Sequence, residues 1–406
     1  MENQCLIGLY RKNNVQCSES HQARLNGRVA KNEDEINIIM KTSDIAKKDP
    51  LRNVPSELRW AAKQDVSGLS DFLMNHPEKP YITCGMGGAF SSCVYSALLY
   101  GAHCGLGRAM TCFAVNSLSD TTLLGSKVLI NSAGGRNDDV VQVADRLQKL
   151  HHPAAANLTM FDNRDNRLKK KISDLNPNNS FNLNGHEVFN EGETFVNITP
   201  AITSYSLYYK AFTGKTDFTG VDLRSRYTYT ANDGQSEVPP LQNIEHFVVL
   251  YGGYGEPVAY DFESMIVESG FASVQLSDYR NFTHGRFCFV GNNLTDGNTA
   301  VVMIVTPREM GIVERYRKLA HNGRFKMSDQ VFPDNTPVIT LETEHDSPLA
   351  SIDLLIQQTR LYSDISDARG VKSFGNPVCK NIDKRTPRSL IRFIKDIQKA
   401  GPITLK

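Results

Sequence analysis

Hydrophobic positions recur along the chain with two different periods, one typical of buried strands and one typical of amphipathic helices. Short apolar runs such as 127–131 predict strands, and the helical spacing of apolar residues in 138–151 predicts a helix. The expected strands are 81–84, 109–115, 127–131, 154–161, 195–198, 246–251, 271–276, 300–305 and 338–342, and the expected helices are 56–76, 90–100, 138–151, 201–212, 257–268, 308–321, 349–361 and 388–399. Because strands and helices alternate, the pattern predicts βαβ units and parallel sheets.

The alternating pattern occurs twice. The loop-rich stretch 214–240, which contains Asn232-Asp-Gly234 and Pro239-Pro240, interrupts it, and the order strand, glycine turn, helix then restarts. We therefore expect an α/β protein with two similar three-layer domains of parallel sheet, at 54–235 and 236–406. Residues 1–53 are polar and irregular, and we expect them to form an N-terminal arm with one short helix around 33–46.

The composition is that of a soluble globular protein, with 406 residues, 40% hydrophobic and 22% charged. A formal net charge of +1 gives no reason to expect binding to nucleic acid or to an anionic membrane. The start of the chain has no signal-peptide pattern and no run of eighteen apolar residues occurs, so we expect a cytoplasmic protein. The eight cysteines show no CxxC pair and no zinc-like spacing, so neither a disulfide framework nor a metal site is expected.

Three glycine clusters directly follow predicted strands. They are Gly85-Met-Gly87-Gly88, Gly134-Gly135 and Gly252-Gly253 with Gly255. Glycines at such places let the backbone approach a ligand, and the next helix presents free amide groups to an anion. The first cluster lacks the third glycine of a dinucleotide-binding loop, and no acidic residue follows about twenty positions on, so no nucleotide cofactor is expected.

The segment Ser132-Ala-Gly-Gly-Arg-Asn-Asp-Asp139 is the strongest candidate for an anion site. One interpretation is structural, because Asn137 or Asp138 suits the N-cap of the following helix. The other is that Ser132 and the loop amides bind an anion, to which Arg136 adds charge-assisted hydrogen bonds. The residues alone leave both interpretations open.

A carboxylate and an imidazole form the second candidate. Glu268 ends a predicted helix, and His284 follows sixteen residues later with Gly285 beside it. These groups can transfer protons if their surroundings tune their pKa values toward neutrality. The structural alternative is a solvated glutamate and a histidine that only holds a loop.

At these residues the chain resembles the tandem SIS (sugar isomerase) family, and is similar to the isomerase half of glucosamine-6-phosphate synthase over about residues 56–400. The family's GxGxS and SxSGxT motifs correspond to 85–89 and 132–137. Its glutamate and HG pair correspond to Glu268 and His284-Gly285, at the spacing found in the synthase. The resemblance implies that Glu268 moves a proton between C1 and C2. It also implies that His284, supplied by a neighbouring subunit, assists ring opening in a homodimer with shared active sites.

The chain departs from the family pattern at several positions. Ala89 and Gly134 stand where the family has serine, and Asn137 stands where it has threonine. Met265 and Arg392 replace lysines of the synthase, and arginine cannot donate a proton at neutral pH. An anion would therefore be held mainly by backbone amides and by Arg136.

These observations predict an enzyme that isomerises a phosphorylated sugar or amino sugar by proton transfer, without metal or cofactor. Glu268 and His284 are the expected catalytic residues. The expected substrate-binding residues are Gly87, Gly88, Ser91, Ser132, Gly135, Arg136, Asn137, Gly253 and Arg392. The alternative is a non-catalytic sugar-phosphate sensor whose N-terminal arm binds a partner.

Overall fold

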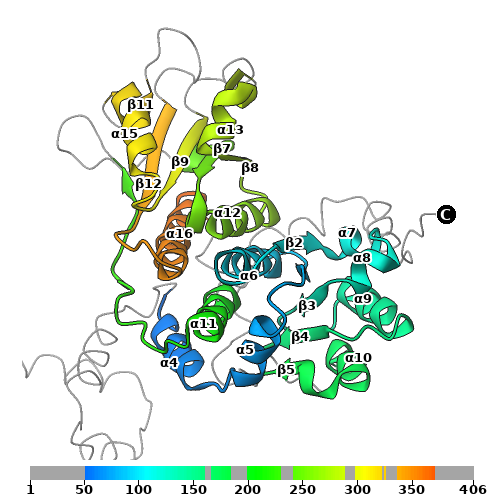
Figure 1. The fold of residues 1–406 in the computed structure, drawn as a ribbon. Helices are drawn as coiled ribbons and strands as arrows, with labels where there is room; N and C mark the ends of the chain where they lie inside the picture. Colours follow the sequence, from blue (N-terminus) through cyan, green and yellow to red (C-terminus); the bar gives the residue numbers. More distant parts are fainter. Residues whose placement is uncertain are drawn as a thin grey trace, which may run out of the picture. The chain divides into compact units, whose positions relative to one another are not determined.

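The structure is a computed structural model, and it describes residues 51–160, 166–183, 199–229, 241–288, 298–321, 324–325 and 336–370. These residues build two separate β-sheets with helices on their faces (Figure 1). The predicted arm, the expected strand 195–198, the expected helix 388–399 and the expected boundary between residues 235 and 236 fall outside the described residues.

The first sheet is entirely parallel and has the strand order β2-β1-β3-β4-β5. Its strands are β1 Tyr81–Gly85, β2 Gly107–Thr111, β3 Lys127–Asn131, β4 Ala155–Thr159 and β5 Ser180–Asn182. Strands β1, β3 and β4 are buried along their whole length, which explains why their sequences are continuous apolar runs. From β1 the chain first adds β2 on one side, and it then crosses to the other side of β1 to add β3, β4 and β5. The direction in which strands are added therefore reverses between β1 and β3.

The second sheet has a parallel centre in the order β12-β9-β7-β8. Its strands are β6 Thr228–Tyr229, β7 His246–Tyr251, β8 Ser273–Asp278, β9 Thr299–Val305, β10 Ala320–His321, β11 Arg324–Phe325 and β12 Thr336–Glu342. The short strands β6, β10 and β11 pair antiparallel at its edge. The order of β8, β7, β9 and β12 repeats that of β2, β1, β3 and β4. In both sheets, the strand that follows the first parallel strand lies on one side of it, and the later parallel strands lie on the other side.

Helices cover both sheets. They are α4 Val54–Lys63, α5 Ser67–Met74, α6 Ala89–His103, α7 Cys112–Asn116, α8 Asp120–Leu124, α9 Asp138–Lys149, α10 Arg167–Leu175, α11 Thr199–Thr213, α12 Glu256–Glu268, α13 Tyr279–Asn281, α15 Met310–Leu319 and α16 Leu349–Ala368. Helices α6, α11, α12 and α16 pack on one another between the sheets (Figure 1). Because protein covers it on all sides, α16 is buried over most of its length.

Most predicted elements form at or near the expected residues, and the α/β fold class with parallel sheets is confirmed. The expected helix 56–76 is two helices, and at the break Lys210 donates hydrogen bonds to the carbonyls of Ala62 and Gln64 while Asp65 accepts one from the amide of Ser67. The expected strand 109–115 stops at Thr111, whose hydroxyl accepts a hydrogen bond from Ala114 and starts α7. The pattern also missed α10 and β5.

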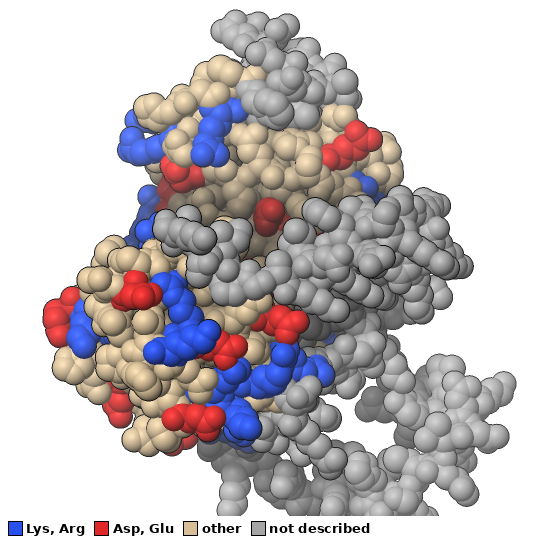
Figure 2. Space-filling model, turned by 90° about the vertical axis from the view of Figure 1, so that its right-hand side faces the viewer, with Lys and Arg blue, Asp and Glu red and all other residues tan. Residues whose placement is uncertain are grey.

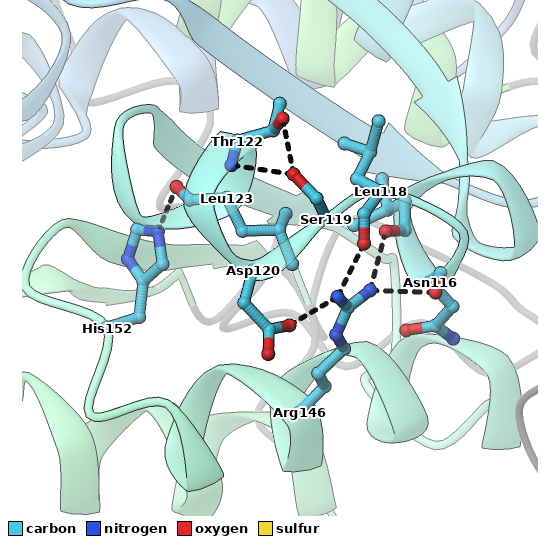
Figure 3. Close-up of polar contacts among 9 residues, drawn as sticks. Asn116, Leu118, Ser119, Asp120, Thr122, Leu123, Arg146 and His152 are labelled. Carbon is cyan, nitrogen blue, oxygen red and sulfur yellow. Dashed lines mark hydrogen bonds and ion pairs between the residues drawn. The ribbon is translucent and has the colours of Figure 1, made fainter. Parts of the chain in front are cut away.

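A network around Arg146 holds the segment between β2 and β3 against α9 (Figure 3). Its guanidinium donates to the carbonyl of Asn116 at 2.7 Å and to the carboxylate of Asp120 at 2.6 Å. The ring of His152, which is fully buried, lies 2.8 Å from the carbonyl of Leu123. These contacts fix α9, whose first residue follows the candidate anion loop.

Candidate active site

The candidate loops 85–88 and 132–137 lie side by side, because they follow β1 and β3, which are adjacent in the first sheet. Winding reverses between these two strands, and open α/β sheets bind ligands at the carboxyl ends of the strands at such a point. Two loops that are 47 positions apart at Gly88 and Gly135 therefore meet in space.

A cavity of about 310 Å³ opens at this point. Its lining combines both loops with residues of α11 and α12, namely Met86, Gly88, Ala89, Ser92, Asn131, Ser132, Ala133, Gly134, Gly135, Arg136, Asn137, Val140, Met160, Pro200, Ala201, Ser204, Asp261, Met265 and Glu268. Six of the predicted site residues, Gly88, Ser132, Gly135, Arg136, Asn137 and Glu268, are among them.

Hydrogen bonds fix the shape of the loop after β3. Ser132 accepts a hydrogen bond from the amide of Gly135 at 3.1 Å, which closes a tight turn. Gly135 has a φ of +63°, and a Cβ there would lie 2.0 Å from Oδ1 of Asn166, so only glycine fits. Two hydrogen bonds hold the side chain of Asn166 in this position. Its Oδ1 accepts from the amide of Lys169 in the first turn of α10, and its Nδ2 donates to the hydroxyl of Thr159.

Asn137 is the N-cap of α9, and its side chain accepts a hydrogen bond from the amide of Asp139 at 2.8 Å. The structural interpretation of Asn137 therefore holds. Two acidic residues occupy the first turn of α9, and one of them, Asp138, pairs with Arg167 at 2.7 Å. Arg136 is exposed at the rim of the cavity, where its charge can reach an anion in the loop.

Glu268 lies against the first loop. A Cβ on Gly87, whose φ is +54°, would stand 3.2 Å from Oε1 of Glu268, so glycine allows this close approach. Ser264, one turn earlier on α12, donates a hydrogen bond of 2.6 Å to the same oxygen. The carboxylate is exposed at the cavity and faces the start of α6, whose positive end favours a negative charge.

Ser91 is placed differently from the expectation. It is buried, and its hydroxyl donates to Oδ1 of Asp261 at 2.9 Å and contacts the carbonyl of Gly88 at 3.0 Å. The next residue, Ser92, lines the cavity instead.

Sequence reasoning did not identify Asp261, Asn131 or Ser92 as site residues. Asp261 stands seven positions before Glu268, which is two helical turns on the same face of α12, and that spacing was a usable signal. Burial raises the pKa of Asp261 to about 7. The Oδ1 atom of Asn131, at the end of β3, has no hydrogen-bond partner within the described ranges although it is buried at the cavity.

In the second sheet, the glycine loop after β7 corresponds to the loop after β1, and a side chain of the protein lies against it. Gly252 and Gly253 follow β7, and the carboxylate of Glu309 lies against them, 2.8 Å and 3.2 Å from where their Cβ atoms would stand. Glu309 also accepts a hydrogen bond from the amide of Thr306 at 3.0 Å. An internal carboxylate therefore occupies the position that an anionic ligand would take at Gly253.

The structure does not bring His284 to the cavity of its own chain. His284 is exposed at a kink in the segment 282–286, after β8, where its ψ of 42° and the φ of +100° at Gly285 are not helical. It is not part of the cavity lining. Arg392 lies outside the described residues. The roles expected for both residues stay predictions.

Charges of both signs are interspersed on the face of the molecule drawn in Figure 2. Among the described residues, Arg167 pairs with Asp138 and Arg146 pairs with Asp120. None of the helices in the described ranges combines the length and hydrophobicity needed to span a lipid bilayer.

No known family model matches the sequence, and a search of curated proteins finds no match. Solved structures do match. The C-terminal domain of glucosamine-fructose-6-phosphate aminotransferase from Francisella tularensis matches with a TM-score of 0.53 at 12% identity, over 82% of this chain and 99% of that chain.

Two further structures match to a similar extent. Tagatose-6-phosphate ketose/aldose isomerase from Escherichia coli has a TM-score of 0.53 at 14% identity, over 81% of this chain and 95% of that chain. Glucosamine-6-phosphate deaminase from Thermotoga maritima has a TM-score of 0.52 at 13% identity, over 80% of this chain and 96% of that chain. The expected SIS-like fold is thus confirmed at the level of fold.

Proposed function

We propose that this chain is an isomerase of phosphorylated sugars or amino sugars, with the cavity at the first sheet as its active site. The observation that carries the proposal is that a glycine-rich loop at the start of a helix and the carboxylate of Glu268 line the same cavity. A volume of about 310 Å³ is at the lower end of the range for small-molecule sites. The three similar structures are named for proteins of sugar 6-phosphates, which supports the proposal by analogy of fold.

In the proposed reaction the phosphate binds at 132–137, held by Arg136 and by amides of this loop other than that of Gly135. The sugar then extends across the cavity toward Glu268 on α12. The carboxylate of Glu268 removes a proton from the carbon next to the carbonyl of the open-chain sugar. It returns that proton to the neighbouring carbon of the resulting enediol, which converts an aldose into a ketose.

His284 is proposed to act in the cavity of a second copy of the chain. Its exposed position outside the cavity lining of its own chain is compatible with such a contribution. The proposed assembly is a homodimer in which each active site contains Glu268 from one subunit and His284 from the other. In that site the imidazole would protonate the ring oxygen and open the sugar ring.

A non-catalytic sugar-phosphate sensor is the second candidate. The observation that favours it is that the hydroxyl of Ser91 is used within the protein, while alanine and glycine at 89 and 134 add no hydroxyl to the cavity. A site that binds through backbone amides and one arginine can hold a phosphate without performing chemistry on the sugar.

The deciding experiment is to incubate the full chain with hexose and amino-sugar 6-phosphates in D₂O. Thermal stabilisation measures binding, and the appearance of deuterium at C2, followed by NMR, measures proton transfer. We expect stabilisation and exchange with at least one sugar phosphate, and loss of exchange with retained stabilisation in the Glu268→Gln variant. Glu263→Gln is the matched control, because Glu263 lies on the same helix but outside the cavity lining.

Stabilisation without any exchange in the unmodified protein would refute the isomerase and leave the sensor. Exchange that survives in Glu268→Gln would refute the role of Glu268.

A further inference from the structure

The cavity contains a second carboxyl group that the proposed reaction has not used. Asp261 lies on α12 and is 3% exposed, and it lines the cavity together with Glu268. The two residues are seven positions apart, so they lie on one face of the helix and roughly 10 Å apart along its axis. Both carboxyls therefore face the same ligand from the same side.

Three helices enclose the carboxyl of Asp261. Ser91 on α6 donates a hydrogen bond of 2.9 Å to Oδ1. Tyr205 on α11 is fully buried, and the charge of Asp261 adds to burial in raising its pKa. On α12 itself, the charge of Glu268 acts on Asp261 in the same direction as burial. Asp261 thus accepts a hydrogen bond from one hydroxyl group, and the charge of a second carboxylate on its own helix acts on it.

These surroundings favour the protonated form of Asp261. Burial raises the pKa of Asp261 to about 7, and the hydrogen bond from Ser91 lowers it by less than burial raises it. Near neutral pH a substantial fraction of the molecules therefore carries a proton on Asp261, whereas Glu268 is exposed. A proton-transfer site commonly pairs an acid whose carboxyl burial keeps protonated with a base in more polar surroundings.

We propose that Asp261 is a catalytic residue that donates a proton to the carbonyl oxygen of the sugar while Glu268 takes the proton from the adjacent carbon. The proposal rests on the isomerase function and names its acid. A base in contact with a carbon, and an acid hydrogen-bonded to the oxygen of the next carbon, stand on the order of 8 Å apart. The spacing of two helical turns agrees with that distance, because glutamate reaches further than aspartate.

The steps balance in protons and electrons. The C–H electron pair forms the C=C bond of the enediol as the C=O π pair takes the proton of Asp261, which leaves Asp261 ionised and Glu268 protonated. In the second half, Asp261 takes the proton from the other enediol hydroxyl as a new C=O forms, and Glu268 protonates the carbon that had carried the original carbonyl. Both residues return to their starting states, and no further reactant is consumed.

The test measures isomerisation and C2 exchange across pH in the full chain, with the sugar phosphate that gives exchange in the unmodified protein. We expect the rate to decline as pH rises through about 7, where Asp261 loses its proton. Asp261→Asn should lower the rate roughly 100- to 10,000-fold while thermal stabilisation by the ligand is kept, and its residual rate should lack that decline. Asp353→Asn, which removes another buried aspartate outside the cavity, is the control and should keep the rate and its decline.

Ser91→Ala gives a second reading that does not depend on removing the carboxyl. The hydrogen bond from Ser91 lowers the pKa of Asp261, so its loss should move the decline to higher pH. A normal rate and an unchanged decline in Asp261→Asn would overturn the role of Asp261 and leave the isomerase intact. If Asp261→Asn does not fold, the test rests on Ser91→Ala. A decline of its rate at the same pH as in the unmodified protein would then overturn the role of Asp261. Absence of exchange in the unmodified protein would overturn both proposals.

Discussion

Replacing Glu57 by glutamine should stabilise the protein, increasingly so as the pH rises. Glu57 lies on α4 and is fully buried, and neither of its carboxylate oxygens has a hydrogen-bond partner among the described residues. A buried carboxylate without partners loses its hydration and gains nothing in exchange. Burial accordingly raises the pKa of Glu57 from 4.5 to about 8.

The size of the effect follows from this difference in pKa. Between pH 4.5 and about 8 the folded protein retains a proton on Glu57 that the unfolded chain has lost, so stability falls as pH rises through this window. Each pH unit corresponds to about 1.4 kcal/mol. Between pH 5 and pH 7 the free energy of unfolding should therefore fall by about 3 kcal/mol from this group, and Glu57→Gln should remove that fall.

Urea unfolding at pH 5 and pH 7 measures the difference. Trp60, the only tryptophan of the chain, lies three residues after Glu57 on the same helix, so its fluorescence reports the unfolding of this region. We expect the two proteins to have similar unfolding free energies at pH 5 and the variant to be more stable at pH 7. Glu78→Gln is the matched control, because the carboxylate of Glu78 is exposed and hydrogen bonding to its own amide lowers its pKa.

An equal gap between wild type and variant at both pH values would refute the reasoning, because a change in packing alone does not depend on the proton. A variant that is less stable than the wild type at pH 7 would show that a positive charge, rather than burial, governs Glu57.

Two further predictions concern the active site. Gly135→Ala should lower the unfolding free energy by roughly 1–3 kcal/mol and abolish thermal stabilisation by sugar phosphates, because φ is +63° and the new Cβ would collide with Asn166. Gly88→Ala has open space at its Cβ and should keep the stability of the protein; equal behaviour of the two variants would contradict this explanation. If active sites are shared in a dimer, co-expression of Glu268→Gln with His284→Asn should restore roughly a quarter of the wild-type rate, because half of the dimers then contain one intact site. No recovery would refute sharing.

Much of the fold could be predicted from sequence, because the period of hydrophobic positions depends only on local geometry and on which face is buried. Strands β3 and β7 form at the predicted residues, and the apolar face of α9, which includes Val140 and Leu147, is buried as expected. The boundary at Thr111 was missed because a single side-chain hydrogen bond ended the strand. The break after Lys63 was missed because the apolar spacing continues across it, while a side-chain turn at Asp65 and hydrogen bonds from the distant Lys210 hold the chain out of a helix there.

Some features of the candidate site could likewise be predicted from the sequence, and others depended on the tertiary structure. The sequence by itself determined that glycine loops follow β1, β3 and β7 and that Glu268 ends a helix, because these are local properties of strands, turns and helices. Only the tertiary structure decided which loops share a cavity, because the period of hydrophobic positions does not determine the order of the strands in a sheet. It placed Glu309 against the loop after β7, and it buried Asp261 where three helices meet. A group's pKa depends on the water that packing removes, and this packing exists only once distant segments have come together.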